Sequence, residues 1–190
     1  MVNGLKHIFS RLWHLVLEAP ETWDIIAREE TEETTLRRRY TYCLIALSAI
    51  TSFCFTWLRV DIQHAIAFSL RDIIVLLSSY FAICWLCRLI LNRIFPKRFN
   101  LEDSDKTVCY CFAYIIIIQT FITIIPHSYY FYLLDLFVAY LLWEAGRAVF
   151  ALEEEERQSM VAYYTIIIVV IPIILTAAFN LLVLKNIPLA

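Results

Sequence analysis

The feature that most constrains this chain is a series of apolar runs long enough to cross a membrane. A spanning helix needs about 20 mostly apolar residues, and five stretches of the sequence approach or exceed this length. Backbone polar groups in lipid must be satisfied within the segment itself, which favours helices. We therefore predict an all-α membrane protein with five transmembrane helices, preceded by short amphipathic interfacial helices. The predicted spans cover about residues 40–58, 66–91, 108–125, 129–150 and 161–184.

The composition agrees with a membrane protein and excludes several kinds of chemistry. The chain is 61% hydrophobic and 18% charged, whereas soluble domains are about 45–50% apolar and about 25% charged. It has only two glycines, too few for a Gly-rich phosphate loop, a dinucleotide fingerprint or a nucleophile elbow. A net charge of −2 gives no basis for nucleic-acid binding. We expect a protein that is not an enzyme and uses no cofactor or metal.

The basic residues predict how the chain is oriented. All Lys and Arg residues except Arg59, Arg71 and Lys185 lie in the first 39 residues or near the loops that follow the second and fourth spans. Loops rich in Lys and Arg stay in the cytoplasm. We therefore predict a cytoplasmic N-terminal segment (1–39), a five-span membrane domain (40–184) and a short outer tail (185–190). No continuous apolar run precedes the first span, so no cleaved signal peptide is expected.

The N-terminal segment has the pattern of two short amphipathic helices. Apolar residues recur at helical spacing over 5–17, which predicts a helix on the inner membrane surface. Pro20 suits the first turn of a second helix, and Trp23, Ile26 and Ala27 share a face that we expect at the lipid interface. The segment either anchors and orients the chain or forms a docking surface for a cytoplasmic partner. The candidate partner-binding residues are Trp23, Glu29, Glu30, Glu32 and Glu33.

Three stretches together resemble a known family. They are "PETWDIIAREE", "CFAYIIIIQTFITIIP" and "AYLLWEAGRAVFALEEEERQSMVAYYTI". Their order resembles the Yip family (Ypt/Rab-interacting proteins, the Yip domain) over roughly residues 15–184. This resemblance implies five spans and a cytoplasmic N-terminus. Eukaryotic members act in membrane trafficking by binding small GTPases and other membrane proteins. The short loops favour a bacterial member, and hence the bacterial inner membrane. No site residue is carried over from the family.

Five polar residues are expected at similar depth in the outer half of the membrane. Charged groups within a membrane are costly and are functional candidates. One interpretation is an outward-facing pocket for a proton, an ion or a small solute. The other is a structural ion pair between Arg71 and Asp135. Asp135 shares a helical face with Gly146, and we expect that face to point into the bundle. The cluster comprises Arg71, Asp72, His127, Asp135 and Asn180.

Two further groups have structural interpretations. Glu144 and Arg147 are three residues apart and are predicted to pair along their helix. Cys109 and Cys111 are two residues apart, so they point about 200° from each other on a helix. This weakens a zinc or redox site formed with Cys84 and Cys87, and we interpret these cysteines as small buried apolar residues.

Two functions from different classes remain open. The first is a membrane adaptor or scaffold that binds an unidentified membrane or cytoplasmic protein through the acidic N-terminal segment and the loops at 92–107 and 150–160. The alternative is a small-solute or ion transporter or channel with a polar site around Asp135 and Arg71. Both functions require the lipid bilayer, and both allow self-association into a homo-oligomer.

Overall fold

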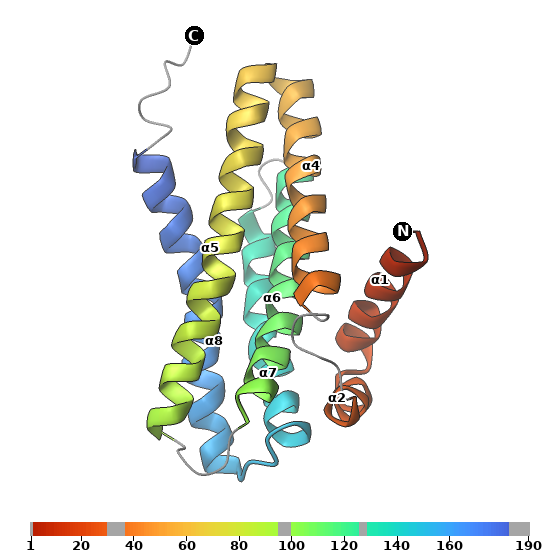
Figure 1. Ribbon diagram of the computed structural model, residues 1–190, viewed down its shortest axis with the longest axis vertical. Helices are drawn as coiled ribbons and strands as arrows, with labels where there is room; N and C mark the ends of the chain where they lie inside the picture. Colours follow the sequence, from red (N-terminus) through yellow and green to blue (C-terminus); the bar gives the residue numbers. More distant parts are fainter. Residues whose placement is uncertain (1, 30–36, 95–99, 126–128, 183–190) are drawn as a thin grey trace.

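The computed structural model describes residues 2–29, 37–94, 100–125 and 129–182, and all regular structure within these ranges is helical (Figure 1). The prediction of an all-α fold is confirmed. Two short helices precede a bundle of longer ones. The elements are α1 (Val2–Leu17), α2 (Ala19–Arg28), a π-helical turn η1 (Arg37–Tyr42), α4 (Cys43–Arg59), α5 (Ile62–Ile94), α6 (Leu101–Ile124), a 3-10 helix η2 (Tyr129–Leu136), α7 (Phe137–Ala148) and α8 (Glu154–Leu182).

Within the described residues, four helices are long and apolar enough to cross a membrane. They cover Tyr40–Arg59, Ile62–Ile90, Leu101–Ile124 and Glu154–Leu181, which correspond to the first, second, third and fifth predicted spans. Three of them begin earlier than predicted, because polar residues start them. The Asp61 carboxylate accepts the backbone N–H of His64 at 2.7 Å at the start of α5, and Asn100 caps α6. Glu154, Glu155 and Glu156 occupy the first turn of α8, where the helix dipole favours acids.

The region predicted as the fourth span is not one continuous α-helix. Residues Tyr129–Leu136 form a 3-10 helix, and only Phe137–Ala148 is α-helical. Runs of 3-10 helix longer than three or four residues are uncommon. At this junction the hydroxyl of Tyr114 donates a 3.0 Å hydrogen bond to the carbonyl of Leu134. A side chain from α6 therefore supplies a bond in the region where the α-helical ladder is interrupted.

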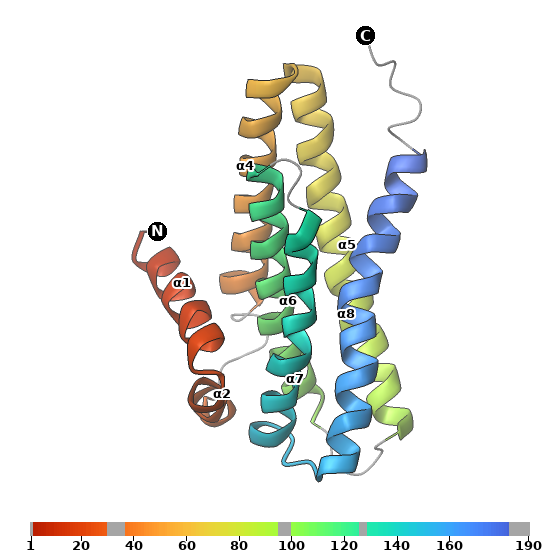
Figure 2. The same ribbon diagram turned by 180° about the vertical axis from the view of Figure 1, so that it is seen from behind.

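The helices form a bundle with two different ends. α4 and α5 make an antiparallel hairpin whose turn extends past the nearby ends of α6 and α8 (Figures 1 and 2). We call this the α4–α5 end. At the opposite end, which we call the α2 end, α1 and α2 fold back against the bundle. η2 and α7 lie beside α6 in both views, as predicted for a helical hairpin. The predicted "PHSY" turn falls mainly at 126–128, outside the described residues.

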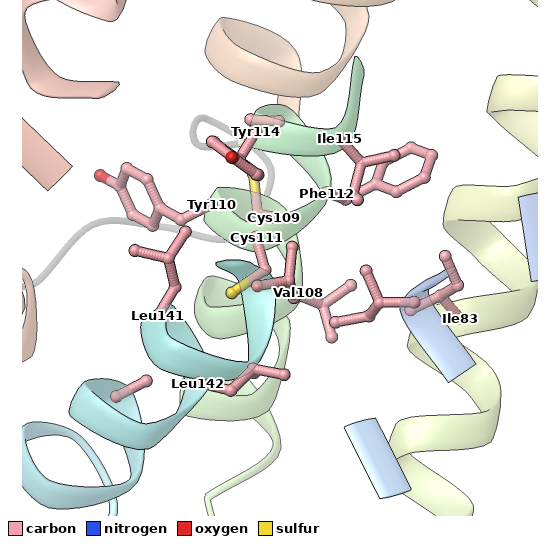
Figure 3. Packing of buried hydrophobic residues seen from close by; sticks show 14 of the residues in the cluster. Ile83, Val108, Cys109, Tyr110, Cys111, Phe112, Tyr114, Ile115, Leu141 and Leu142 are labelled. Carbon is pink, nitrogen blue, oxygen red and sulfur yellow. The ribbon is translucent and has the colours of Figure 1, made fainter. Parts of the chain in front are cut away.

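The core of the bundle is centred on α6. Residues Thr107–Ile116 of this helix are all buried, because other elements surround it on every side. Figure 3 shows part of this packing, with Val108 and Phe112 of α6 lying between Leu142 of α7 and Ile83 of α5. A helix that is apolar all round is expected in such a central position.

Candidate functional site

A cavity among the described residues lies between five elements, toward the α4–α5 end. Its volume is about 490 Å³, which falls within the range of small-molecule sites, roughly 300–1,000 Å³. Its lining combines an apolar wall with charged and amide side chains. The lining residues are Ser48 of α4; Arg71, Asp72, Val75 and Leu76 of α5; Gln119, Ile122 and Thr123 of α6; Tyr132 of η2; and Pro172, Ile173, Thr176, Ala177 and Asn180 of α8.

An ion pair between consecutive residues supplies the charge in this cavity. Arg71 donates from Nε (2.9 Å) and from Nη2 (2.7 Å) to the same oxygen of Asp72, Oδ1. The Arg71 guanidinium also lies over the ring of Phe68, 4.7 Å from its centroid. The sequence-based prediction of an Arg71–Asp135 pair is therefore wrong. Arg71 lies on α5 and Asp135 lies on η2. Asp72 is the next residue in the chain, so Arg71 can pair with it without any distant segment being brought into position.

Asp135 is buried on η2 without lining the cavity. Asp135 is only 3% exposed, and its Oδ1 atom has no hydrogen-bond partner among the described residues. In a 3-10 helix, positions three apart share a face, so Asp135 lies one turn deeper than Tyr132, which does line the cavity. The predicted inward orientation of this face is confirmed, because Leu142 and Gly146 are buried as well.

The cavity thus brings together part of the predicted polar cluster. Arg71, Asp72 and Asn180 line it, Asp135 does not, and His127 lies outside the described residues. The Oδ1 atom of Asn180 is buried and has no partner among the described residues. Sequence reasoning missed Gln119 and Tyr132 as lining residues. Gln119 interrupts an otherwise apolar run, and that interruption is the signal that would have found it.

At the α2 end, Trp23 is enclosed by protein. It is 0% exposed, and its ring meets the ring of Tyr110 edge to face with centroids 5.9 Å apart. Tyr40 packs on the other side of Tyr110 at 5.0 Å. The prediction that Trp23 and Ile26 rest at the lipid interface is wrong, because both are buried against the bundle. Trp23 therefore positions α2 on α6 and offers no free surface to a partner.

Polar bonds hold the C-terminal end of α2 in place. Arg11 of α1 bonds the Glu29 carboxylate, and Lys106 of α6 donates to the Glu29 carbonyl at 2.7 Å. Burial alone would lower the pKa of Arg11, but the hydrogen bond and charge of Glu29 outweigh it and raise that pKa. Glu29 is thus occupied within the chain. The other candidate acids, Glu30, Glu32 and Glu33, lie outside the described residues.

Arg147 links α7 to α2. Its Nε donates to Glu144 at 3.0 Å, which confirms the predicted pair. Its Nη2 also donates to the Pro20 carbonyl at 3.2 Å and to Asp24 at 3.3 Å. Sequence reasoning predicted only the pairing of Arg147 with Glu144. The bonds from Arg147 to α2 could not be predicted from the sequence, because α2 and α7 are separated by more than a hundred residues.

Sequence reasoning also missed a buried ion pair near this end. Arg88 of α5 donates from Nε to Asp105 of α6 at 2.9 Å, and the Asp105 side chain is fully buried. Ser104 next to it shares a 2.8 Å hydrogen bond with the Tyr164 hydroxyl of α8. These bonds tie α5, α6 and α8 together where the sequence suggested only a polar loop.

The four cysteines considered for a zinc or redox site are all buried: Cys84, Cys87, Cys109 and Cys111. Cys109 and Cys111 leave α6 in different directions (Figure 3), as their spacing predicts. The Cys109 sulfur lies 3.3 Å from the Thr41 hydroxyl. Within the described part of the chain, no group of three or more His, Cys, Asp or Glu side chains is placed to hold a metal ion.

The four long apolar helices, packed around a charged cavity and joined to a docked N-terminal segment, define a multi-pass helical membrane protein. A model of the Yip1 domain matches residues 15–179 of the sequence, and the chain belongs to the Yip1 domain family. This confirms the resemblance seen in the sequence. No match is found among curated proteins or among solved structures.

Proposed function

We propose that this protein is a non-enzymatic membrane scaffold that binds another protein at its α2 end. The observation that carries this proposal is the docking of α2. Trp23 is buried against Tyr110, and Arg147 and Lys106 bond α2 and the residue after it to α7 and α6. α2 is therefore docked on the bundle, and a partner that binds α2 is held close to the membrane helices. Membership of the Yip1 domain family is consistent with such a role.

We also propose that η2 and α7 together form a fifth span. The eight residues of η2 rise about 2.0 Å each and extend for about 16 Å. The twelve residues of α7 rise about 1.5 Å each and add about 18 Å. The combined length of about 34 Å exceeds the hydrocarbon thickness of about 30 Å. With five spans, the basic-residue bias supports a cytoplasmic N-terminus and an outer C-terminus, and the membrane that we propose is a bacterial inner membrane.

The partner-binding surface that we propose consists of four exposed acids at the α2 end. Glu21 of α2 is exposed, and so are Glu153, Glu154 and Glu155 at the start of α8. Trp23 and Glu29 are engaged within the chain and act by holding α2. A partner with a basic surface would be attracted by these acids, and the attraction would weaken as the salt concentration rises.

Charge neutralisation tests the scaffold without disturbing the fold. In the full-length protein, Glu21, Glu153, Glu154 and Glu155 are replaced by Gln, and partners are cross-linked in the native membrane and identified by mass spectrometry. We expect the specific partner to be lost. Asp61→Asn at the α4–α5 end is the control, because Asn also serves as a helix cap. Deleting the N-terminal segment is a poorer test, because it would uncover the buried Tyr110.

Two results would count against this proposal. Capture of the same partner by the neutralised variant would exclude these acids as the binding surface. Recovery of second copies of the chain alone, with no other protein, would contradict the adaptor function itself.

The charged cavity supports a second candidate function, that of a small-solute or ion transporter. Its support is the placement of the Arg71–Asp72 pair on a cavity within the bundle. Asp135 lies one turn deeper and is available as a proton-binding group. Vesicles that contain the protein and a pH-sensitive dye test the proton version. We expect proton flux in the wild type and its loss in Asp135→Asn at unchanged folding, and an absence of flux in the wild type would contradict it.

A further inference from the structure

We propose that the cavity binds the headgroup of a phospholipid that carries a primary ammonium, the phosphoethanolamine headgroup. The phosphate would lie against Arg71 and the ammonium against Asp72 and Asn180. This inference rests on the second candidate function only in taking the cavity to be a binding site. It is independent of the scaffold at the α2 end.

The depth of the cavity matches a lipid headgroup. Two of its polar lining residues lie close to helix ends: Thr123 precedes the last residue of α6, and Asn180 lies two residues before the end of α8. At about 1.5 Å per residue, both are within about 3 Å of those ends. The α4–α5 turn extends beyond both ends (Figure 1). The cavity therefore begins at the level where α6 and α8 end, and its charged pair lies deeper, because Arg71 is nine residues, or about 14 Å, from the start of α5. A headgroup that binds this pair must insert between the helices.

The cavity is also accessible from the side of the bundle. α8 leans away from α5 toward the α4–α5 end (Figures 1 and 2), and the cavity lies between these helices. Ile173, one of the lining residues, is 51% exposed, so the wall of the cavity continues onto a surface that faces lipid. Val75, Leu76 and Ile122 supply apolar lining for acyl chains. A lipid can thus insert its headgroup while its tails stay in the bilayer.

The polar groups suit a zwitterion better than a single ion. The cavity carries one positive and one negative side chain, and both are largely shielded, with 19% of Arg71 and 14% of Asp72 exposed. An Arg guanidinium is well suited to a phosphate. Both bonds from Arg71 go to Oδ1 of Asp72, which leaves Oδ2 to accept from a ligand. The Oδ1 atom of Asn180, which has no hydrogen-bond partner within the described part of the chain, is a second acceptor.

These two acceptors distinguish between lipid headgroups. A primary ammonium has three N–H groups and can donate to Asp72 and Asn180 at the same time. A choline headgroup has no N–H, and a glycerol headgroup has no positive charge. The polar groups of the cavity therefore select phosphatidylethanolamine over phosphatidylcholine and phosphatidylglycerol.

Native mass spectrometry of the full-length protein tests this selection. The protein is released from bilayers that contain equal amounts of the three lipids, and the retained lipids are counted by mass. We expect one retained phosphatidylethanolamine in the wild type and about tenfold less in Asn180→Leu and Asp72→Asn. Glu144→Gln is the matched control, because it neutralises the acid of another Arg–acid pair at the α2 end. It should leave lipid retention unchanged.

Several results would overturn the proposal. One is equal retention of all three lipids by the wild type, and another is unchanged retention by Asn180→Leu. If Asp72→Asn unfolds because Arg71 loses its partner, the double variant Arg71→Gln with Asp72→Asn leaves no lone charge and must still lose the lipid. Displacement of the lipid by free glycerophosphoethanolamine at equal concentration would show that the ligand is a soluble headgroup and would overturn the lipid assignment.

Discussion

Two tryptophans of the N-terminal segment occupy opposite environments. Trp13 of α1 is 64% exposed, whereas Trp23 of α2 is 0% exposed. Both lie on apolar faces at helical spacing, so the sequence pattern treats them alike. On α1, Ile8 and Leu12 face the bundle, which leaves Phe9 and Trp13 on the side that faces away from it. The same residue type thus serves as a core residue in one helix and as a surface residue in the next.

Replacing each tryptophan by alanine separates these two roles. Trp23→Ala removes a fully buried ring that contacts Tyr110, and we expect it to lower the free energy of unfolding by about 3–5 kcal/mol. Trp13→Ala is the matched control and should change that free energy by no more than about 0.5 kcal/mol. Denaturant unfolding in detergent micelles measures both values. Equal effects of the two substitutions would contradict the packing of α2 on α6.

At the scale of elements, the contact between α7 and α8 depends on a glycine. A Cβ atom added at Gly146 would lie 2.8 Å from Cγ of Arg157. The Arg157 guanidinium lies over the ring of Trp143, 4.4 Å from its centroid. The absence of a side chain at Gly146 therefore lets the stem of Arg157 cross α7 and reach that ring, which connects α8 to α7 beside the docked α2.

Substitutions of Gly146 should depend strongly on side-chain size. Alanine favours a helix over glycine by about 0.5–1 kcal/mol, but it displaces Arg157 from Trp143, a contact worth about 0.5–1 kcal/mol at a surface. We expect Gly146→Ala to be near neutral and Gly146→Leu to destabilise by about 1–3 kcal/mol through overpacking. Thermal unfolding in micelles measures both. Ala162→Leu, on the exposed face of α8, is the control, and an equally large loss there would contradict the role of this contact.

At the scale of the whole molecule, the number of spans decides on which side each terminus lies. The described part of the chain contains four long apolar helices, and the η2–α7 segment is proposed to cross the membrane as a fifth span. An even number of spans places the two termini on the same side of the membrane, and an odd number places them on opposite sides.

Protease protection of terminal tags distinguishes these arrangements. In right-side-out vesicles, an impermeant protease should digest a tag at the C-terminus and spare one at the N-terminus. A tag inserted at the α4–α5 turn serves as a control and should be digested together with the C-terminal tag. In inverted vesicles the pattern should reverse. Digestion of both terminal tags from the same side would show that η2 and α7 do not cross.

The sequence by itself determined the helical class, the position of the long apolar segments, the Yip resemblance and the Glu144–Arg147 pair. These properties depend on hydropathy and on spacing within one helix, which are local. Only the tertiary structure decided that Trp23 is buried and that Asp135 lies outside the cavity. Apolar periodicity shows which face of a helix avoids water, but it does not show whether lipid or protein covers that face. The rotation of each helix about its axis is set by its neighbours, and those contacts join residues far apart in the chain.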